Sequence, residues 1–202
     1  VPLSVAHVDV TAHCEKNRHL SIEMAARELR YGAFERLSQG KIATAHTLSD
    51  SVETMLIHIA RGTGLDGICG IPPVRGRIVR PLIEVTRSQV EAFCEECGQN
   101  YVTDSTNASP KFTRNRLRSD VVPVLKTINP SFEAAAGRLM RLAAGDADYM
   151  EHAAEYLLRS ATEPTGLVVR KIANLHPALR TRIIRRFLIE EGQSVDEQTI
   201  QR

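Results

Sequence analysis

The chain has 202 residues, of which 43% are hydrophobic and 25% are charged, which is typical of a globular protein that buries a core in one domain or two. Its formal net charge is +2. So small a positive net charge is no evidence for a nucleic-acid partner, because such binding depends on local patches of Lys and Arg, which the net charge does not reveal. No apolar run reaches the length of a membrane-spanning helix, and the first residues lack a signal-peptide pattern. We therefore expect no membrane contact and a cytoplasmic location.

The first third of the chain predicts alternating strands and helices. Residues 1–10 are rich in β-formers and predict a strand. Residues 21–37 predict a helix, with an apolar stripe at helical spacing and Ser21 as its cap. A short turn then leads into the apolar run 42–45, which predicts a buried strand. This order is typical of a parallel α/β sheet.

The stretch 41–70 organises the rest of the chain. After the strand at 42–45, a polar turn leads into a helix whose apolar face is formed by Val52, Met55, Leu56 and Ile59. Gly62 is a natural place for this helix to end. The glycine-rich run 61–67 that follows allows close backbone approach to a ligand, although such a run alone is weak evidence for phosphate binding.

His46 and Asp50 lie between that strand and that helix. Ligands of open α/β sheets bind beyond the carboxyl ends of the strands, where a helix N-terminus offers free N–H groups and partial positive charge. Both residues are therefore candidate ligand contacts. From spacing alone, the structural explanation is the stronger one, with Asp50 as an N-cap in a capping box with Glu53 and His46 as a polar loop residue.

The middle of the chain predicts an extended segment at 71–83, then a helix at 86–98 that begins at Thr86 or Ser88. Cys94 and Cys97 lie inside this helical pattern, and the sequence holds no second Cys or His pair to complete a zinc site, so we expect ordinary packing for both.

Two later stretches carry positive charge. Residues 101–107 predict a strand that breaks into a polar turn, and residues 113–118 hold three arginines, which form either a phosphate-binding patch or a solvated surface. A long Ala-rich helix is predicted at 131–159, with an apolar face formed by Phe132, Ala135, Ala136, Leu139 and Ala143. A short strand at 167–169 and a basic helix at 177–191 follow.

Several of these stretches, in this order, resemble one known family. The segments ATAHTLSDSVETMLIHIARGTGLDGICGIPPVRG, IVRPLIEVTRSQVEAFC, YVTDSTN and FTRNRLRSDVVPVL are similar to the tRNA(Ile)-lysidine synthetase family of N-type ATP pyrophosphatases. The resemblance covers roughly residues 21–188. It implies a Rossmann-like parallel-sheet domain, here incomplete, at residues 1–127, and a mainly helical tRNA-binding and substrate-binding domain, cut short at its C-terminus, at residues 128–202.

The resemblance also implies an activity. Family members are ligases that use ATP to adenylate a cytidine in the anticodon of tRNA(Ile), and the ε-amine of L-lysine then displaces AMP to form lysidine. The implied cofactors are ATP and Mg²⁺, and the implied partners are tRNA(Ile) and L-lysine. The oligomeric state is left open, with a homodimer as one option.

Residue roles carry over by position. Within AARELRY, Arg30 corresponds to the arginine that contacts the ATP phosphates, or Arg27 if the alignment shifts. The implied catalytic residues are Arg30, His46, Asp50 and Arg118. Of these, Arg30, His46 and Arg118 would contact ATP and Asp50 would bind Mg²⁺. The implied tRNA contacts are Arg61, Arg114, Asn115 and Arg116.

The sequence departs from the family pattern in two places. The S-G-G-x-D-S loop that cradles pyrophosphate occurs nowhere in the chain, so we expect a fragment that lacks the N-terminal part of the protein. The common His-His-Ala-Asp-Asp pattern reads His46-Thr47-Leu48-Ser49-Asp50 here. Two alternatives therefore stay open: another tRNA-modifying N-type pyrophosphatase, such as a thiolating enzyme, and a non-catalytic RNA-binding fragment.

Overall fold

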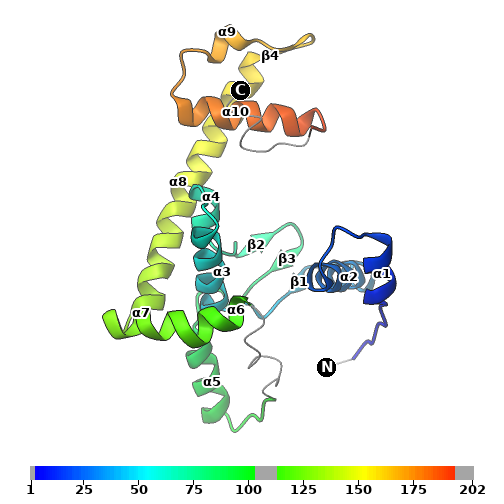
Figure 1. Ribbon diagram of the computed structural model, residues 1–202, viewed down its shortest axis with the longest axis vertical. Coiled ribbons are helices and arrows are strands. Elements are labelled where there is room, and N and C mark those ends of the chain that lie inside the picture. Colours follow the sequence, from blue (N-terminus) through cyan, green and yellow to red (C-terminus); the bar gives the residue numbers. More distant parts are fainter. Residues whose placement is uncertain (1–2, 103–112, 194–202) are drawn as a thin grey trace. The chain divides into compact units, whose positions relative to one another are not determined.

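The computed structural model describes residues 3–102 and 113–193 (Figure 1). The chain divides into two compact units, which are described separately below. The first unit contains residues 1–51 and 71–102, and the second contains residues 52–70 and 103–202. Helix α3 (Leu48–Ala60) contributes residues to both units. The domain boundary expected after residue 127 stays a prediction.

The first unit begins with two helices, α1 (Val10–Lys16) and α2 (Ile22–Leu37). Helix α2 is confirmed, with its expected cap: the Ser21 hydroxyl accepts a hydrogen bond from the Met24 N–H at 3.2 Å. The strand expected at residues 1–10 is wrong for the described part, because residues 3–9 form no strand. Asp9 instead caps α1 by accepting a hydrogen bond from the Ala12 N–H. A local cap needs only neighbouring residues, whereas a strand needs a pairing partner.

Three short strands form the sheet of this unit: β1 (Ile42–Ala43), β2 (Val74–Arg75) and β3 (Ile78–Val79), in the order β1-β3-β2. The β1 and β3 strands run parallel, with Ile42 opposite Ile78, while β2 and β3 form an antiparallel hairpin. Gly76 has a φ of 57° in the hairpin turn, a conformation that favours glycine. The expected parallel pairing is confirmed for β1 and β3, although both strands are shorter than the sequence predicts.

Helix α5 (Arg87–Glu96) closes the first unit as the sequence predicts. Thr86 and Gln89 form a reciprocal capping box, and Gly98 has a left-handed φ of 62° just beyond the end of the helix. The strand expected at residues 101–107 is not formed at Tyr101 and Val102, and its remaining residues lie outside the described part of the chain.

The second unit is mainly helical in its described residues. Besides α3 it contains α4 (Leu65–Ile68), α6 (Thr113–Arg116), the π-helix η2 (Leu117–Val121), α7 (Val122–Ile128), α8 (Phe132–Ala161), β4 (Thr162–Glu163), β5 (Gly166–Leu167), α9 (Val169–Ile172) and α10 (Pro177–Glu190). Strands β4 and β5 form an antiparallel pair. None of the described helices is both long and apolar enough to cross a membrane.

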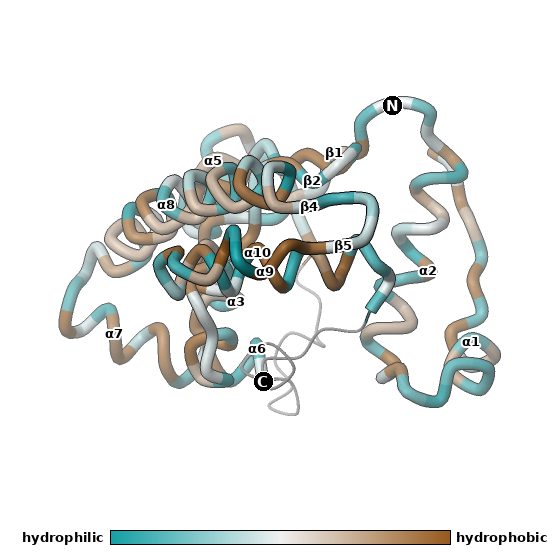
Figure 2. Tube along the Cα trace, turned by 90° about the horizontal axis from the view of Figure 1, so that it is seen from above, coloured by the Kyte–Doolittle hydropathy of each residue, from teal (hydrophilic) through white to brown (hydrophobic). Residues whose placement is uncertain are grey.

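Helix α8 confirms the expected long amphipathic helix, and apolar and polar positions alternate along it (Figure 2). The buried face of α8 includes Met140 in place of Leu139, which the sequence analysis had placed on that face. Leu139, expected inside, is 50% exposed, whereas its neighbour Met140 is buried. The buried positions Ala136, Met140, Ala143 and Ala147 recur at intervals of three or four residues, so helical geometry places Leu139 off their line.

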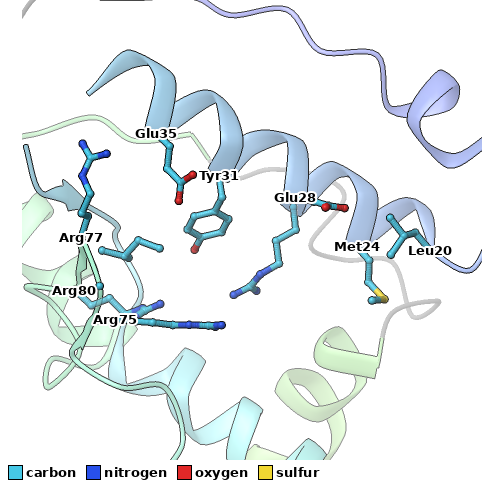
Figure 3. Close-up of a pocket in the computed structure, with 11 residues that line it drawn as sticks. Leu20, Met24, Glu28, Tyr31, Glu35, Arg75, Arg77 and Arg80 are labelled. Atoms are coloured by element: carbon cyan, nitrogen blue, oxygen red, sulfur yellow. The ribbon is translucent and has the colours of Figure 1, made fainter. Parts of the chain in front are cut away.

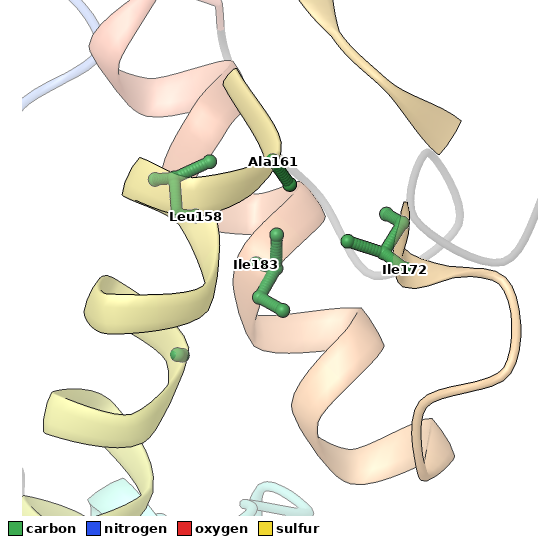
Figure 4. Packing of buried hydrophobic residues seen from close by; sticks show 5 residues of the cluster. Leu158, Ala161, Ile172 and Ile183 are labelled. Carbon is green, nitrogen blue, oxygen red and sulfur yellow. The ribbon is translucent and has the colours of Figure 1, made fainter. Parts of the chain in front are cut away.

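The core of the second unit lies where α8, α9 and α10 meet (Figure 4). It consists of five buried apolar residues: Ala154, Leu158, Ala161, Ile172 and Ile183. The strand expected at residues 167–169 is only partly formed, since Leu167 ends β5 and Val169 begins α9. That helix carries Ile172 into the core.

Replacing Ile183 by alanine should lower the free energy of unfolding by about 2–5 kcal/mol, because the side chain is fully buried and its loss leaves a cavity. Ile189→Ala on the same helix removes the same atoms from a side chain that is 56% exposed, so it should cost well under about 1 kcal/mol. Urea unfolding of both variants measures the difference. Equal losses would show that the core does not lie at Ile183.

Candidate functional site

The loop between β1 and α3 places His46 beyond the carboxyl end of a parallel strand, as the sequence predicts. Strand β1 ends at Ala43, and the Thr44 N–H continues the pairing with a hydrogen bond to the carbonyl of Val79 at 2.9 Å. The half-buried ring of His46 is oriented by a 2.9 Å hydrogen bond between its Nδ1 and the Thr44 hydroxyl. An imidazole held at this edge of a sheet lies where ligands of α/β folds bind.

Asp50 lies in the first turn of α3, and its carboxylate closes a capping box with Thr47. Asp50 Oδ2 accepts hydrogen bonds from the Thr47 N–H and hydroxyl, both at 2.8 Å. The Asp50 N–H donates to Thr47 Oγ1 at 3.3 Å. The expected capping box of Asp50 with Glu53 is therefore wrong. Helix α3 begins at Leu48, so Thr47 is its N-cap residue and Asp50, three residues later, is the acidic member of the box. Negative charge here is favoured by the helix dipole.

Two serines near Asp50 connect the start of α3 to other segments of the first unit. The Ser49 hydroxyl accepts a hydrogen bond from the Arg87 N–H at 3.0 Å, and the Ser51 hydroxyl accepts one from the Ile71 N–H at 2.9 Å. Ser49 occupies the place of the first Asp in the family pattern. In this chain the residue at that place accepts a hydrogen bond from Arg87, the first residue of α5. Neither contact was predictable from local sequence patterns, because the partners are 38 and 20 residues away.

In the second unit, the arginine segment 113–118 is fixed to α3 by an ion pair that the sequence analysis missed. Arg118 Nε donates to Glu53 Oε1 at 2.7 Å, and Arg118 Nη2 donates to Glu53 Oε2 at 3.0 Å. Glu53 is only 2% exposed, so this bidentate pair is largely removed from water on the Glu53 side. Nearby, Arg114 Nη2 donates to the Thr54 hydroxyl at 3.3 Å. The sequence signal for this ion pair was Glu53 itself, a carboxylate that directly follows Val52 of the apolar face of α3.

Arg118 lies within the π-helix η2, between α6 and α7. Pro123 follows in the first turn of α7. Proline cannot donate a backbone hydrogen bond, and its ring would clash with the carbonyl of Ser119 in a continuous α-helix, so the wider π-turn accommodates it. Such π-turns occur frequently at functional sites.

The other expected tRNA contacts also lie in the second unit. Arg116 is exposed on α6, and Asn115 beside it is half-buried. Arg61 is exposed just after the end of α3. Arg30 lies in the first unit, on the exposed surface of α2. The two units thus divide the expected site residues between them, with Arg30, His46 and Asp50 in the first.

The glycine-rich run 61–67 has structural roles in the second unit. Gly62 has a φ of 74° just after α3, which an L-residue with a side chain rarely adopts. A Cβ atom on Gly67 would lie 1.9 Å from the Thr63 hydroxyl, so only glycine fits this turn without a shift of that side chain. The carbonyl of Gly67 also lies 3.0 Å from His58 Nδ1. These contacts order the segment that follows α3.

A metal ion bound at Asp50 would need other oxygen ligands. Among the described residues, no group of three or more His, Cys, Asp and Glu side chains is arranged to hold a metal. Mg²⁺ commonly uses one or two carboxylates together with substrate phosphates and water, so a single Asp fits a magnesium ion that arrives with a nucleotide. It does not fit a structural zinc site.

The cysteines have the environments of packing residues. Cys94 on α5 is half-buried, Cys97 just beyond it is exposed, and both are free thiols. Cys69 donates a hydrogen bond to the carbonyl of Leu65, and its burial raises the pKa of the thiol, with a further contribution from the charge of Asp66. A raised pKa leaves less thiolate at neutral pH, which makes Cys69 a poor nucleophile.

Three arginines of α10 face carboxylates of the same unit. Arg182 and Arg185 pair with Asp66 in α4, and Arg182 and Arg186 pair with Glu151 on α8. These ion pairs reduce the positive charge that the basic helix presents, and they join α10 to α4 and α8.

Comparison with known proteins identifies the class to which this fold and site belong. Residues 1–125 match a family model described as a PP-loop domain, and the chain therefore belongs to the PP-loop family, an α/β class of ATP pyrophosphatases. The family predicted from the sequence motifs is confirmed.

The similar curated proteins are named tRNA(Ile)-lysidine synthase. The one from Clostridium acetobutylicum is 36% identical over 208 residues, which cover 97% of this chain and 45% of the relative. The one from Bacteroides thetaiotaomicron is 44% identical over 65% of this chain and 32% of the relative, and the one from Parabacteroides distasonis is 52% identical over 56% of this chain and 27% of the relative. The chain thus spans less than half the length of these relatives.

Proposed function

We propose that the chain is part of a tRNA(Ile)-lysidine synthase, an ATP-dependent ligase that joins L-lysine to the wobble cytidine of tRNA(Ile). One observation carries the proposal: the lysidine synthase of Clostridium acetobutylicum aligns with 97% of the chain, through the PP-loop match and the helical residues beyond it. The placement of His46 and Asp50 at the β1–α3 junction supports it, because a nucleotide-activating site needs groups at that edge of the sheet.

The proposed reaction has two steps. The ring carbonyl oxygen of the cytidine attacks the α-phosphate of ATP, pyrophosphate leaves, and the ε-amine of lysine then displaces AMP from the activated ring. The site must stabilise negative charge that develops on the departing pyrophosphate. In this proposal Arg30, His46 and Arg118 contact the phosphates. Asp50 would hold Mg²⁺, which would supply further positive charge at the phosphates.

The proposed tRNA contacts are the polar side chains Arg61, Arg114, Asn115 and Arg116. Arginine binds phosphate oxygens through two parallel N–H groups, and it keeps its charge at any physiological pH. Residues 128–202 form the second, tRNA-facing domain in this proposal. A tRNA substrate would place the reaction in the cytoplasm, and a homodimer is the assembly we would test first by light scattering.

The natural gene product that contains this chain should incorporate labelled lysine into tRNA(Ile) only when ATP and Mg²⁺ are present. Filter binding of the labelled tRNA measures the product, and a tRNA whose wobble cytidine is replaced by uridine serves as the matched control. Incorporation of sulfur in place of lysine would contradict the proposal and favour a thiolating pyrophosphatase. The raised pKa of the Cys69 thiol argues against that alternative for this cysteine.

A further inference from the structure

A cavity of about 700 Å³ lies within the first unit, between α2 and the β2–β3 hairpin (Figure 3). Helix α2 contributes Arg27, Glu28 and Tyr31 to its lining, and the hairpin region contributes Arg75, Arg77 and Arg80. Arg30, His46 and Asp50 are not part of this lining. The volume falls within the range of about 300–1,000 Å³ that is typical of small-molecule sites, so it is larger than one phosphate group requires.

The lining carries an excess of positive charge. Four arginines, Arg27, Arg75, Arg77 and Arg80, face two carboxylates, those of Glu28 and Glu35. Glu28 Oε2 lies 3.1 Å from His13 Nε2, so it has a partner outside the lining. Within the part of the chain that the structure describes, the ion pairs found involve none of these four arginines. The cavity is therefore suited to an anion.

Arg80 is the strongest indication of a ligand. Arg80 is only 4% exposed, and its Nη1 donates to the carbonyl of Pro72 at 2.6 Å. Its Nε is buried without a hydrogen-bond partner among the described residues. A buried cation that lacks an anionic partner is costly, and an anion bound in the cavity would offset that cost. Arg77 donates hydrogen bonds to the carbonyl oxygens of Ser38 and Gly40, which carry no formal negative charge to offset that of the guanidinium.

The rest of the lining is apolar or aromatic. Tyr31 projects from α2 into the cavity and faces Arg75 and Arg80, which reach toward it from the hairpin (Figure 3). The guanidinium of Arg27 lies 5.4 Å from the centroid of the Tyr31 ring. Positive groups beside an aromatic ring are the combination that proteins use to bind single-stranded nucleic acid, with phosphates on the arginines and a base on the ring.

We propose that this cavity binds one nucleotide of single-stranded RNA, with its phosphodiester at Arg75 and Arg80 and its base against Tyr31. The inference rests on the proposed function insofar as tRNA supplies the RNA. The anticodon loop is single-stranded, so its bases are available for stacking.

The test measures RNA binding by the 202-residue chain directly. A fluorescein-labelled RNA hairpin with a single-stranded loop is titrated by fluorescence anisotropy at several salt concentrations. Arg75→Ala removes an exposed cavity arginine that holds no core contact, and Arg36→Ala removes an exposed arginine on α2 that lies outside the cavity. Circular dichroism checks that both variants fold.

Arg75→Ala should raise the Kd for the hairpin at least about fivefold and reduce the slope of log K against log salt by about 0.7, the loss of one phosphate contact on a single strand. Tyr31→Leu should raise the Kd with an unchanged slope, because it removes stacking and leaves the charges. Arg36→Ala should change neither quantity. Arg27→Ala, on the α2 side of the cavity, should have the same two effects as Arg75→Ala.

Three results would overturn the proposal: no binding of the hairpin by the parent chain, equal effects of Arg75→Ala and Arg36→Ala, or displacement of the hairpin from the cavity by ATP with the same dependence on Arg75. The lysine-incorporation assay is scored separately. Lysine incorporation without dependence of RNA affinity on Arg75 rejects the cavity alone, whereas Arg75-dependent RNA binding without lysine incorporation rejects the proposed ligase and retains the cavity.

Discussion

Asp50→Asn in the natural gene product should lower the rate of ATP-dependent adenylation at least about 100-fold, because removal of one preorganised charge from a phosphoryl-transfer site typically has an effect of this size. The asparagine oxygen can still accept a hydrogen bond from the Thr47 N–H, which the carboxylate accepts at 2.8 Å. The free energy of unfolding should therefore change by less than about 1 kcal/mol. Pyrophosphate release measures the first quantity, and urea unfolding measures the second.

Thr47→Ala is the matched control, since it breaks the same capping box from the other side and leaves the Asp50 carboxylate in place. It removes the hydroxyl that donates to Asp50 Oδ2 and accepts from the Asp50 N–H. Stability should fall by about 1 kcal/mol while adenylation stays within a few-fold of the parent rate. If Asp50→Asn keeps full activity and only stability changes in the two variants, Asp50 acts as a capping residue and the proposed metal contact is rejected.

Arg118→Ala should lower the free energy of unfolding by about 2–3 kcal/mol, because it removes the guanidinium partner of the buried Glu53 carboxylate. The expected loss is smaller than for a fully buried pair, since the Arg118 side chain is 32% exposed and partly screened by water. Urea unfolding measures the loss. Arg114→Ala removes only a 3.3 Å hydrogen bond to Thr54 and should cost less than about 1 kcal/mol.

A double variant separates the stabilising role of Arg118 from its proposed contact with ATP. Replacing both Glu53 and Arg118 by methionine removes the charges together, so stability should recover most of the loss seen in Arg118→Ala. Adenylation should not recover, because the positive charge at the phosphates is still missing. Recovery of both quantities would show that Arg118 acts only through Glu53 as an anchor for the 113–118 segment.

The sequence by itself determined the elements whose signals are local. Helix α2 begins after the Ser21 cap and α5 after the Thr86 capping box, and both were predictable because each cap bonds to a backbone group three residues away. The long helix α8 followed from apolar positions at helical spacing. The PP-loop class of ATP pyrophosphatases followed from the motifs, and the match of residues 1–125 to the PP-loop model confirms it.

Only the tertiary structure decided contacts between residues far apart in the chain. The partner of Glu53 is Arg118, 65 residues away, and α3 proved to be capped by Thr47. The cavity contains Arg27 and excludes Arg30, although the two lie three residues apart on α2. Local hydrogen bonds are fixed by a few neighbouring residues, whereas ion pairs, strand pairing and cavities depend on how distant segments come together, which periodicity and spacing do not record.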